Sequence, residues 1–408
     1  MSETKRNVPK LRFPGFEGEW EQRKLGELYE RVNERNDGSL GRDKWISVAK
    51  MYFQDPEKVQ SNNLDTRTYV MQRGDIAFEG HPNSEFKFGR FVLNDIGTGI
   101  ISELFPIYRP IVEYDLNFWK YAIQLERIMA PIFAKSITSS GNSSNKLDQN
   151  HFLKQTITTP TVDEQKAIGS FFENISNLIV LYQRKLENLK LKKKALLQKL
   201  FPKNGEQFPE LRFPGFTDAW EQRKLGECSV IITGGTPGTR ILEYWSPKEI
   251  PWMSSGEINK KRISKTDDKI SKLGLEQSSA RWVKKNSILI ALAGQGKTRG
   301  TVAINEIDLT TNQSIAAIEL DSVFNTEFVF QNLDSRYDEL RKESSGDGTR
   351  GGLNKKIISD LYIPYTEYKE QDIIGDFFKK LDNLITLHQR KLEHLQLQKK
   401  DLLQQMFV

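Results

Sequence analysis

The segment 291–298, Ala-Leu-Ala-Gly-Gln-Gly-Lys-Thr, fits the relaxed pattern of a phosphate-binding loop, A/G-x-x-x-x-G-K-S/T, and follows an apolar run. Such a loop holds nucleotide phosphates only when it opens a helix, whose first backbone N–H groups point at the phosphates. Here the next residues, 299–304, read Arg-Gly-Thr-Val-Ala-Ile, a pattern typical of a strand. The corresponding segment of the first half, 80–87, also joins two expected strands. We therefore interpret both segments as hairpin loops and expect no nucleotide hydrolysis.

Other catalytic and metal signatures are absent from the sequence. It contains no Asn-Pro-Pro-Tyr motif of a methyltransferase, no GxGxxG after an expected strand, no GxSxG and no HExxH. The four histidines and the single cysteine, Cys228, do not have the spacing of zinc ligands. We therefore expect a chain that is not an enzyme and has no catalytic residue, no bound metal and no cofactor of its own.

The polar loops instead suit DNA. Arg and Lys side chains reach guanine O6 and N7, and Asn and Gln pair with adenine N6 and N7. The small-residue loops 138–146 and 344–352 could bring backbone amides to phosphates. The run 233–240 and the basic cluster 260–262 are further candidates. The predicted DNA-binding residues are His81, Asn83, Lys87, Arg90, Ser140, Asn142, Lys146, Thr236, Arg240, Lys261, Gln295, Lys297, Thr298, Arg299, Ser345 and Arg350.

The segments around these loops are written twice. Residues 11–27 return as 211–227 with 14 of 17 positions identical, at an offset of 200. Residues 164–201 return as 370–407 with 23 of 38 identical, at an offset of 206. The stretches between show no comparable identity. The pattern indicates one duplicated frame that carries two different inserts.

The repeated C-terminal blocks predict two long helices. In each block, apolar residues alternate at spacings of four and three, which is the seam of a coiled coil, and one lysine interrupts each seam, Lys193 and Lys399. A helix of this length extends for about 57 Å at roughly 1.5 Å per residue. We expect the helices to pair antiparallel within the chain; the alternative is that each packs on its own domain.

The two inserts share an order of elements, which predicts a mixed α/β fold with a pseudo-twofold internal repeat. Strands are expected at 45–49, 75–79, 88–94 and 101–109, and at 250–253, 287–293, 300–305 and 313–320. A helix should follow at 116–135 or 325–342, then a short helix near 147 or 353 and a strand to 160 or 364. The predicted parts are an opening segment with the first globular domain (1–162), the first long helix (163–201), a linker (202–211), the second domain (212–367) and the second long helix (368–408).

Composition limits the class of protein. The net charge is +6 with a pI near 9.0, and residues 240–300 carry 13 Lys or Arg against 6 Asp or Glu, which suits a phosphate-contacting surface. One cysteine excludes an internal disulfide and favours a reducing cytoplasm. No run of 18 apolar residues and no apolar N-terminal segment is present, so we expect a cytoplasmic protein without a membrane partner.

Two repeated motifs together resemble a known family. They are Phe-Pro-Gly-Phe followed by Trp-Glu-Gln-Arg-Lys-Leu-Gly-Glu, and the run from 160 to 168 that leads into Leu-Tyr-Gln-Arg-Lys-Leu at 181–186. With both repeated, the chain resembles, over essentially its whole length, the specificity (S) subunit of type I restriction-modification systems. The second copy departs from the pattern in lacking a proline directly before Lys369-Glu370-Gln371.

The resemblance implies two target recognition domains, each reading one half of an asymmetric bipartite site in double-stranded DNA, with the helices setting the spacer. It also implies two modification (methyltransferase) subunits docked on the helices, and restriction (motor-nuclease) subunits joining through them. S-adenosylmethionine, ATP and magnesium would belong to those partners. The alternatives are the specificity subunit of a type IIB-like system and a stand-alone DNA-binding regulator or scaffold. Neither the target bases nor the spacer length follows from the sequence.

Overall fold

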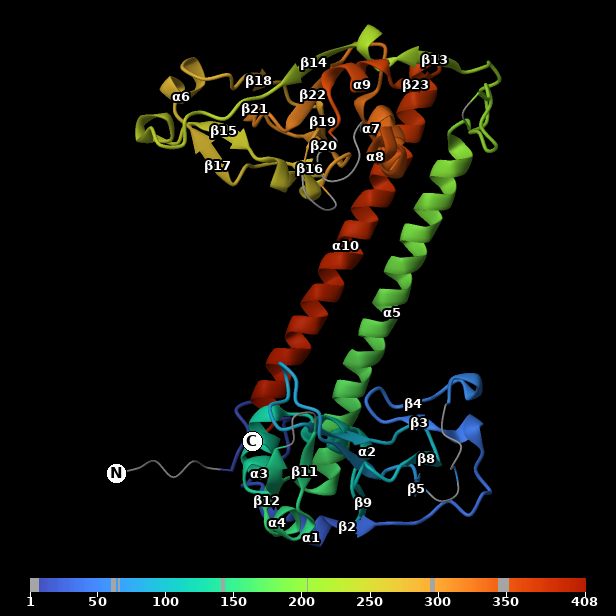
Figure 1. Cartoon of the computed structure of the whole chain (residues 1–408), viewed down its shortest axis with the longest axis vertical. Helices are drawn as coiled ribbons and strands as arrows, with labels where there is room; N and C mark the ends of the chain where they lie inside the picture. The colour runs from blue at the N-terminus through green and yellow to red at the C-terminus, as the bar shows by residue number, and fades with distance from the viewer. Residues whose placement is uncertain are drawn as a thin grey trace. The chain divides into compact units, whose positions relative to one another are not determined.

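The computed structural model describes residues 7–59, 64, 67–140, 144–203, 205–293, 298–343 and 352–408. The chain forms two compact units, and both long helices contribute to both of them. Unit 1 is Met1–Gln183 with Arg390–Val408, and unit 2 is Arg184–Gln389. The long helices are α5 (Val162–Leu200) and α10 (Tyr368–Met406), labelled in Figure 1. Each unit therefore contains one insert and a part of each long helix.

Unit 1 is built on a four-stranded sheet in the order β2-β9-β6-β7, with paired strands β5-β8, β3-β4, β1-β12 and β10-β11 beside it. Its strands are β1 (Glu21–Lys24), β2 (Tyr29–Val32), β3 (Ile46–Ser47), β4 (Tyr52–Phe53), β5 (Thr68–Met71), β6 (Ile76–Glu79), β7 (Arg90–Leu93), β8 (Gly99–Ser102), β9 (Ile107–Pro110), β10 (Ile137–Ser140), β11 (Asn145–Leu147) and β12 (Thr156–Thr159). Its short helices are α1 (Leu25–Leu28), α2 (Leu116–Ala122), α3 (Glu126–Ala134) and α4 (Gln149–Lys154), with 3₁₀ turns η1 (Arg42–Lys44) and η2 (Pro56–Lys58).

Unit 2 has a five-stranded sheet, β14-β22-β19-β20-β16, a four-stranded sheet, β17-β15-β21-β18, and the pair β13-β23. Its strands are β13 (Glu221–Lys224), β14 (Ser229–Thr233), β15 (Ile250–Met253), β16 (Arg262–Ile263), β17 (Asp268–Ile270), β18 (Trp282–Val283), β19 (Ile288–Ala291), β20 (Val302–Asn305), β21 (Leu309–Thr311), β22 (Ile315–Leu320) and β23 (Tyr362–Tyr365). Its short helices are α6 (Lys272–Glu276), α7 (Thr326–Ser335), α8 (Tyr337–Glu343) and α9 (Lys355–Asp360), with 3₁₀ turns η3 (Leu225–Glu227), η4 (Leu242–Tyr244) and η5 (Ser255–Lys260).

Most predicted elements lie where the apolar patterns placed them, and three predicted elements were wrong. The expected strand 101–109 is two strands, because the chain turns after β8, which pairs with β5, before β9 pairs with β2 and β6. The expected single helices 116–135 and 325–342 are each two helices. In the first, the break at 123–125 lets Ile123 and Phe133 both bury in one core.

The duplicated sequence motifs form one clamp in each unit. Arg12 makes two hydrogen bonds of 2.7 Å to the carboxylate of Glu164, to which the indole N–H of Trp20 also donates. In the second copy Arg212, at 2.7 and 2.8 Å, and the indole of Trp220 bind Glu370 in the same way. Both carboxylates are buried. A buried carboxylate is stable only with such partners, which explains why the Arg, Trp and Glu positions are identical in both copies.

The long helices pair antiparallel inside each unit, as predicted. In unit 1, Lys399 near the end of α10 donates to Ser176 in the first half of α5, at 2.8 Å. In unit 2, Lys193 near the end of α5 donates to Asp382 in the first half of α10, at 2.6 Å. The alternative of helices that pack separately is therefore excluded. We call these two contacts between the long helices the joints. They are equivalent, because the offset of 206 relates Lys193 to Lys399 and Ser176 to Asp382.

Candidate nucleic-acid interface

The predicted loops of the first half meet at one place in unit 1. β6 and β7 pair antiparallel and leave residues 80–89 as a hairpin loop, as expected. The backbone N–H of Asn145, at the start of β11, donates to the carbonyl oxygen of Gly80 at 2.8 Å. A Cβ on Gly80 would lie only 2.2 Å from the Asn145 carbonyl oxygen, so the close approach of the loops requires glycine there. The loop of His81 therefore lies beside the loop that ends at Lys146.

Unit 2 repeats this arrangement with different side chains. β19 and β20 pair antiparallel, and the N–H of Leu353 donates to the carbonyl oxygen of Leu292 at 2.9 Å, at the base of the 292–301 loop. The segment with the phosphate-loop pattern thus joins two paired strands, and the residues after it form β20 instead of a helix. A helix N-terminus for phosphates is missing, which supports the interpretation as a hairpin.

In unit 1, two of the nominated side chains are committed to the protein. Asn83 Oδ1 accepts hydrogen bonds from the N–H groups of Glu85 and Phe86 and so shapes the loop. Arg90 pairs with Glu79 at 2.9 Å and donates to the carbonyl of Ala49 at 2.6 Å. His81, Lys87 and Lys146 are exposed, and the Lys87 ammonium lies 5.2 Å from the ring centroid of Phe88.

In unit 2, the run 233–240 is a firmly held loop. The indole N–H of Trp252 donates to the carbonyl of Gly235 at 3.0 Å, and that of Trp245 donates to the carbonyl of Gly238 at 3.2 Å. The hydroxyl of Thr236 donates to Gln313 at 2.7 Å. Arg240, at the end of the loop, is exposed. An exposed arginine on a rigid loop suits the bidentate recognition of a guanine.

The remaining nominated residues have different surroundings. Lys261 forms an ion pair with Asp334 at 2.5 Å, so its charge is balanced inside the unit. Thr298 and Arg299 are half-buried, and the Thr298 carbonyl accepts a hydrogen bond from Thr301. Outside the described residues lie Asn142, Gln295, Lys297, Ser345, Arg350 and the side chain of Ser140.

The basic surplus of 240–300 is smaller than composition indicates, because six of its cations pair with carboxylates. The pairs are Lys248–Asp268, Lys260 with Glu257 and Asp267, Lys261–Asp334, Arg262–Glu327, Lys272–Glu249 and Lys284–Glu319. Within the described part of this segment, five exposed cations have no ion pair: Arg240, Lys265, Lys269, Arg281 and Lys285. Of these, Arg240 was predicted from the sequence as a DNA-binding residue, whereas the other four were included only in the count of charges. Only the tertiary contacts distinguish these exposed cations from the paired ones.

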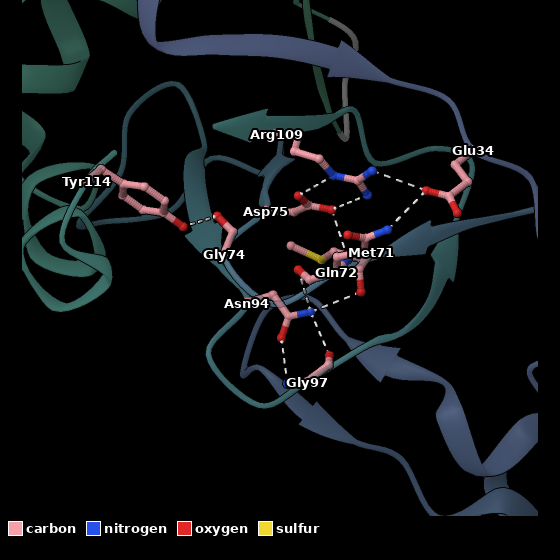
Figure 2. Close-up of polar contacts among 9 residues, drawn as sticks. All are labelled: Glu34, Met71, Gln72, Gly74, Asp75, Asn94, Gly97, Arg109 and Tyr114. Atoms are coloured by element: carbon pink, nitrogen blue, oxygen red, sulfur yellow. Dashed lines mark hydrogen bonds and ion pairs between the residues drawn. The ribbon is translucent and has the colours of Figure 1, made fainter. Parts of the chain in front are cut away.

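A polar network that sequence reasoning missed holds the turn before β6. Figure 2 shows Arg109 facing Asp75, with two hydrogen bonds of 2.9 Å, and Glu34 on its other side. The hydrogen bonds with Asp75 raise the pKa of Arg109. Asn94, fully buried, donates to the carbonyls of residues 71, 72 and 97. In unit 2 the buried Asn305 has the same role before β19 and donates to the carbonyls of residues 284 and 307.

In the described residues, neither the thiol of Cys228 nor the acidic side chains form a reactive or metal-binding site. Burial raises the pKa of Cys228 to about 11, so its thiol stays protonated near neutral pH and is a poor nucleophile or metal ligand. Among the residues with assigned positions, no group of His, Cys, Asp and Glu could hold a metal ion. No helix in the described ranges is long and apolar enough to cross a membrane.

Comparisons with known proteins agree with the repeated motifs. Residues 217–397 match the family described as the type I restriction modification DNA specificity domain. The MjaIX type I restriction enzyme specificity subunit of Methanocaldococcus jannaschii is 27% identical over 194 residues, 47% of this chain and 44% of the relative. The EcoR124I/EcoR124II specificity subunit of Escherichia coli is 25% identical over 166 residues, 40% of this chain and 41% of the relative. The match thus spans less than half the length of either relative.

The fold is similar over nearly the whole chain. The solved structure of a type I restriction-modification system S subunit from M. genitalium has a TM-score of 0.58 at 16% identity, and the match covers 98% of this chain and 99% of that one. The names of these relatives agree with the prediction of a recognition subunit and not an enzyme. In sequence and in fold, the chain is therefore similar to the specificity subunits of type I restriction-modification systems, as its duplicated motifs predicted.

Proposed function

We propose that this chain is the non-catalytic DNA specificity subunit of a type I restriction-modification complex, in which each insert reads one half of a bipartite site. One observation carries the proposal: two equivalent frames each bring the ends of the same two loops together, and the loops differ in sequence. The first pair includes His81 and Lys146, and the second frame adds the rigid loop of Arg240. Because the side chains differ, the two half-sites should differ, and the target should be asymmetric.

The helices are proposed to set the spacer between the half-sites. Domains that read successive major grooves on one face of B-DNA need half-sites about 34–36 Å apart, which is one helical turn. A pair of helices of about 57 Å at roughly 1.5 Å per residue is long enough for such a separation. Inserting four residues between Gln198 and Pro209, a segment that includes the end of α5, should lengthen the preferred spacer and leave both half-sites unchanged.

Exposed leucines in the duplicated segments support docking of two identical partners. At equivalent positions of the two copies, large fractions of the same side chains face solvent, although an apolar side chain gains nothing there unless a partner covers it. The pairs are Leu11 and Leu211, Leu178 and Leu384, Leu181 and Leu387, and Leu191 and Leu397. We assign this surface to the modification subunits, one on each copy. S-adenosylmethionine, ATP and magnesium would then act on the partner chains, including the restriction subunits.

The docking surface is tested by charge insertion. Leu181→Glu and Leu387→Glu should each remove one modification subunit from the complex, and the double variant should remove both, as measured by native mass spectrometry. Leu104→Glu is the matched control, because Leu104 is also exposed but lies in the insert of unit 1. Loss of both partners from a single variant, or an effect of Leu104→Glu, would contradict separate equivalent sites.

The recognition function is tested by exchanging one insert. The chain is expressed with its modification subunits, and N6-methyladenine is mapped by long-read sequencing. Replacing residues 228–362 by the insert of a relative should change one half-site and leave the other unchanged. An unchanged methylated sequence would reject DNA reading by this insert. Methylation that depends on the chain also argues against the alternative of a stand-alone regulator, which should bind one sequence tightly without a methyltransferase. Cleavage on both sides of the site would favour the type IIB-like alternative.

A further inference from the structure

The end of α10 in unit 1 is capped by a guanidinium from the same unit. Arg127 donates through Nη2 to the carbonyl oxygens of Leu403, Gln404 and Phe407, at 3.2, 3.5 and 2.8 Å. Figure 1 shows the C-terminus beside α3, the helix that carries Arg127. The last carbonyls of a helix have no partner within the helix, and a cation there is doubly favoured by hydrogen bonding and by the helix dipole.

The equivalent residues of α5 line a cavity. The offset of 206 relates Leu403, Gln404 and Phe407 to three residues of unit 2, which are Leu197, Gln198 and Phe201. All three line a cavity of about 1040 Å³. In the part of the chain that the structure describes, no side chain donates to their carbonyl oxygens, so the acceptors that Arg127 occupies in unit 1 remain open here.

Unit 2 has an arginine at the corresponding place, but this arginine binds a carboxylate instead of the end of α5. Arg336 lies directly before α8, as Arg127 lies at the start of α3. It makes two hydrogen bonds to Glu339, at 2.8 and 2.5 Å, and one to the carbonyl of Tyr362 at 2.6 Å. Three residues after Arg127, unit 1 has Ala130 where unit 2 has Glu339. The arginine that could cap α5 is therefore engaged by Glu339 and by the carbonyl of Tyr362.

The rest of the cavity lining also offers acceptors. Asn332 also lines the cavity, and its buried Oδ1 has no hydrogen-bond partner among the described residues. Asp360 adds a carboxylate whose nearest cation, Lys224, is 3.5 Å away. The cations of the lining are Lys199, which pairs with Glu210 at 2.6 Å, Arg336, which pairs with Glu339, and the exposed Lys203. Tyr362 provides an exposed aromatic ring at the cavity.

We propose that this cavity of unit 2 binds the guanidinium group of an arginine carried by a partner chain, which caps α5 as Arg127 caps α10. A guanidinium matches several acceptors in one plane, and its charge suits the helix end and the carboxylates. The cavity is larger than one side chain, so residues that flank the arginine fit as well. The modification subunit is the partner, an identification that rests on the proposed function.

The site is tested first with small probes on the full chain, independently of DNA and partners. Agmatine carries the guanidinium, and n-butylamine is the matched ammonium. Calorimetric titration should give one agmatine per chain, bound at least tenfold more tightly than n-butylamine. Glu339→Ala frees Arg336 to close the site from within and should weaken agmatine at least tenfold. Asp338→Ala removes the same charge from an exposed residue of α8 and should bind as the original chain does.

The reciprocal variant opens the site in unit 1. Ala130→Glu gives Arg127 a carboxylate three residues away, so the stoichiometry of agmatine should rise from one to two. Absence of agmatine binding, equal loss in Glu339→Ala and Asp338→Ala, or a stoichiometry of one in Ala130→Glu would each overturn the proposal. Thermal melts of every variant separate these results from loss of folding.

The partner is tested with the modification subunit. Agmatine should weaken its complex with the chain, and a variant chain with Glu339→Ala should bind it more weakly than the Asp338→Ala control. Agmatine binding without competition would overturn the partner as the source of the guanidinium. Sequence-dependent methylation by the same complex is scored in parallel, so a failure of this site is distinguished from a failure of the proposed function.

Discussion

The two joints between the long helices each place a lysine in a half-buried seam, but different groups stabilise its charge. In unit 2, Lys193 meets the carboxylate of Asp382, which also accepts a hydrogen bond from Gln331 at 2.7 Å. In unit 1, Lys399 lies 4.7 Å from the ring centroid of Tyr121 and donates to Ser176, a neutral partner. Burial, and then repulsion by Lys120, lowers the pKa of Lys399. The comparison teaches that the duplicated frame conserves the position of the lysine and not the means of neutralising it.

The two buried clamps differ in one donor, and breaking them should have the largest effect. Glu370 accepts an additional hydrogen bond of 2.5 Å from Thr366, whose equivalent in the first copy is Pro160. Glu164→Ala should destabilise unit 1 by about 3–5 kcal/mol, because the half-buried Arg12 loses its carboxylate partner and the buried indole N–H of Trp20 loses its acceptor. Glu370→Ala should cost about 1 kcal/mol more for the lost hydroxyl partner. Hydrogen exchange of β1 and of β13 measures the two effects separately, with the exposed Glu367→Gln as control; equal losses would contradict the difference.

Recognition should differ between the rigid loop of unit 2 and the hairpin of unit 1. Arg240→Ala should relax the preference for one base pair in one half-site, by about 1–3 kcal/mol, if the guanidinium reads a guanine. Arg90→Ala should leave base preferences unchanged, because Arg90 is committed to Glu79 and Ala49. Methylation maps of both variants measure whether the preferred bases change. A uniform weakening without a change of sequence would make Arg240 a phosphate contact.

The joints are compared by exchanging their partners. Asp382→Ser gives unit 2 the residue of unit 1 and should cost about 1–3 kcal/mol, because the ammonium of Lys193 and the amide of Gln331 both lose a half-buried acceptor. Denaturant unfolding, with hydrogen exchange of α7 as the local probe, measures the loss. Thr386→Ser is the control on the same helix, since its hydroxyl still reaches the carbonyl of Asp382. No change in Asp382→Ser would show that a serine hydroxyl stabilises Lys193 as well as the carboxylate does.

The reverse exchange should have the smallest effect and a dependence on pH. Ser176→Asp gives Lys399 a carboxylate and should stabilise unit 1 by about 0.2–1 kcal/mol near neutral pH. In the original chain the folded pKa of Lys399 lies below its unfolded value, so the unfolded state binds more protons and stability rises with pH between these two values. The groups that face the ammonium are Lys120, Tyr121 and Glu173. The advantage of Ser176→Asp should therefore shrink as pH rises toward 10; a constant advantage would contradict this.

Much of the fold could be predicted, because local apolar spacing specifies local structure. The strands around 76–79 and 288–291 lie where apolar runs placed them. The kinks of the two insert helices and the split of 101–109 could not be predicted, since they follow from which sheet or core each half joins. For the candidate site, the sequence placed the loops correctly as hairpins. It did not separate the exposed Arg240 from the committed Arg90.

By itself, the sequence determined the duplicated frame, the two long helices and the absence of a phosphate-binding helix, because identical side chains at identical spacing make the same local structure. Only the tertiary structure decided which cations remain for a nucleic acid and which helix end stays open. Lys261 is neutralised by Asp334, 73 residues away, and Arg127 caps α10 at residues 276 to 280 positions later. Such pairings depend on how distant segments fold together, and the charge pattern along the chain does not encode them.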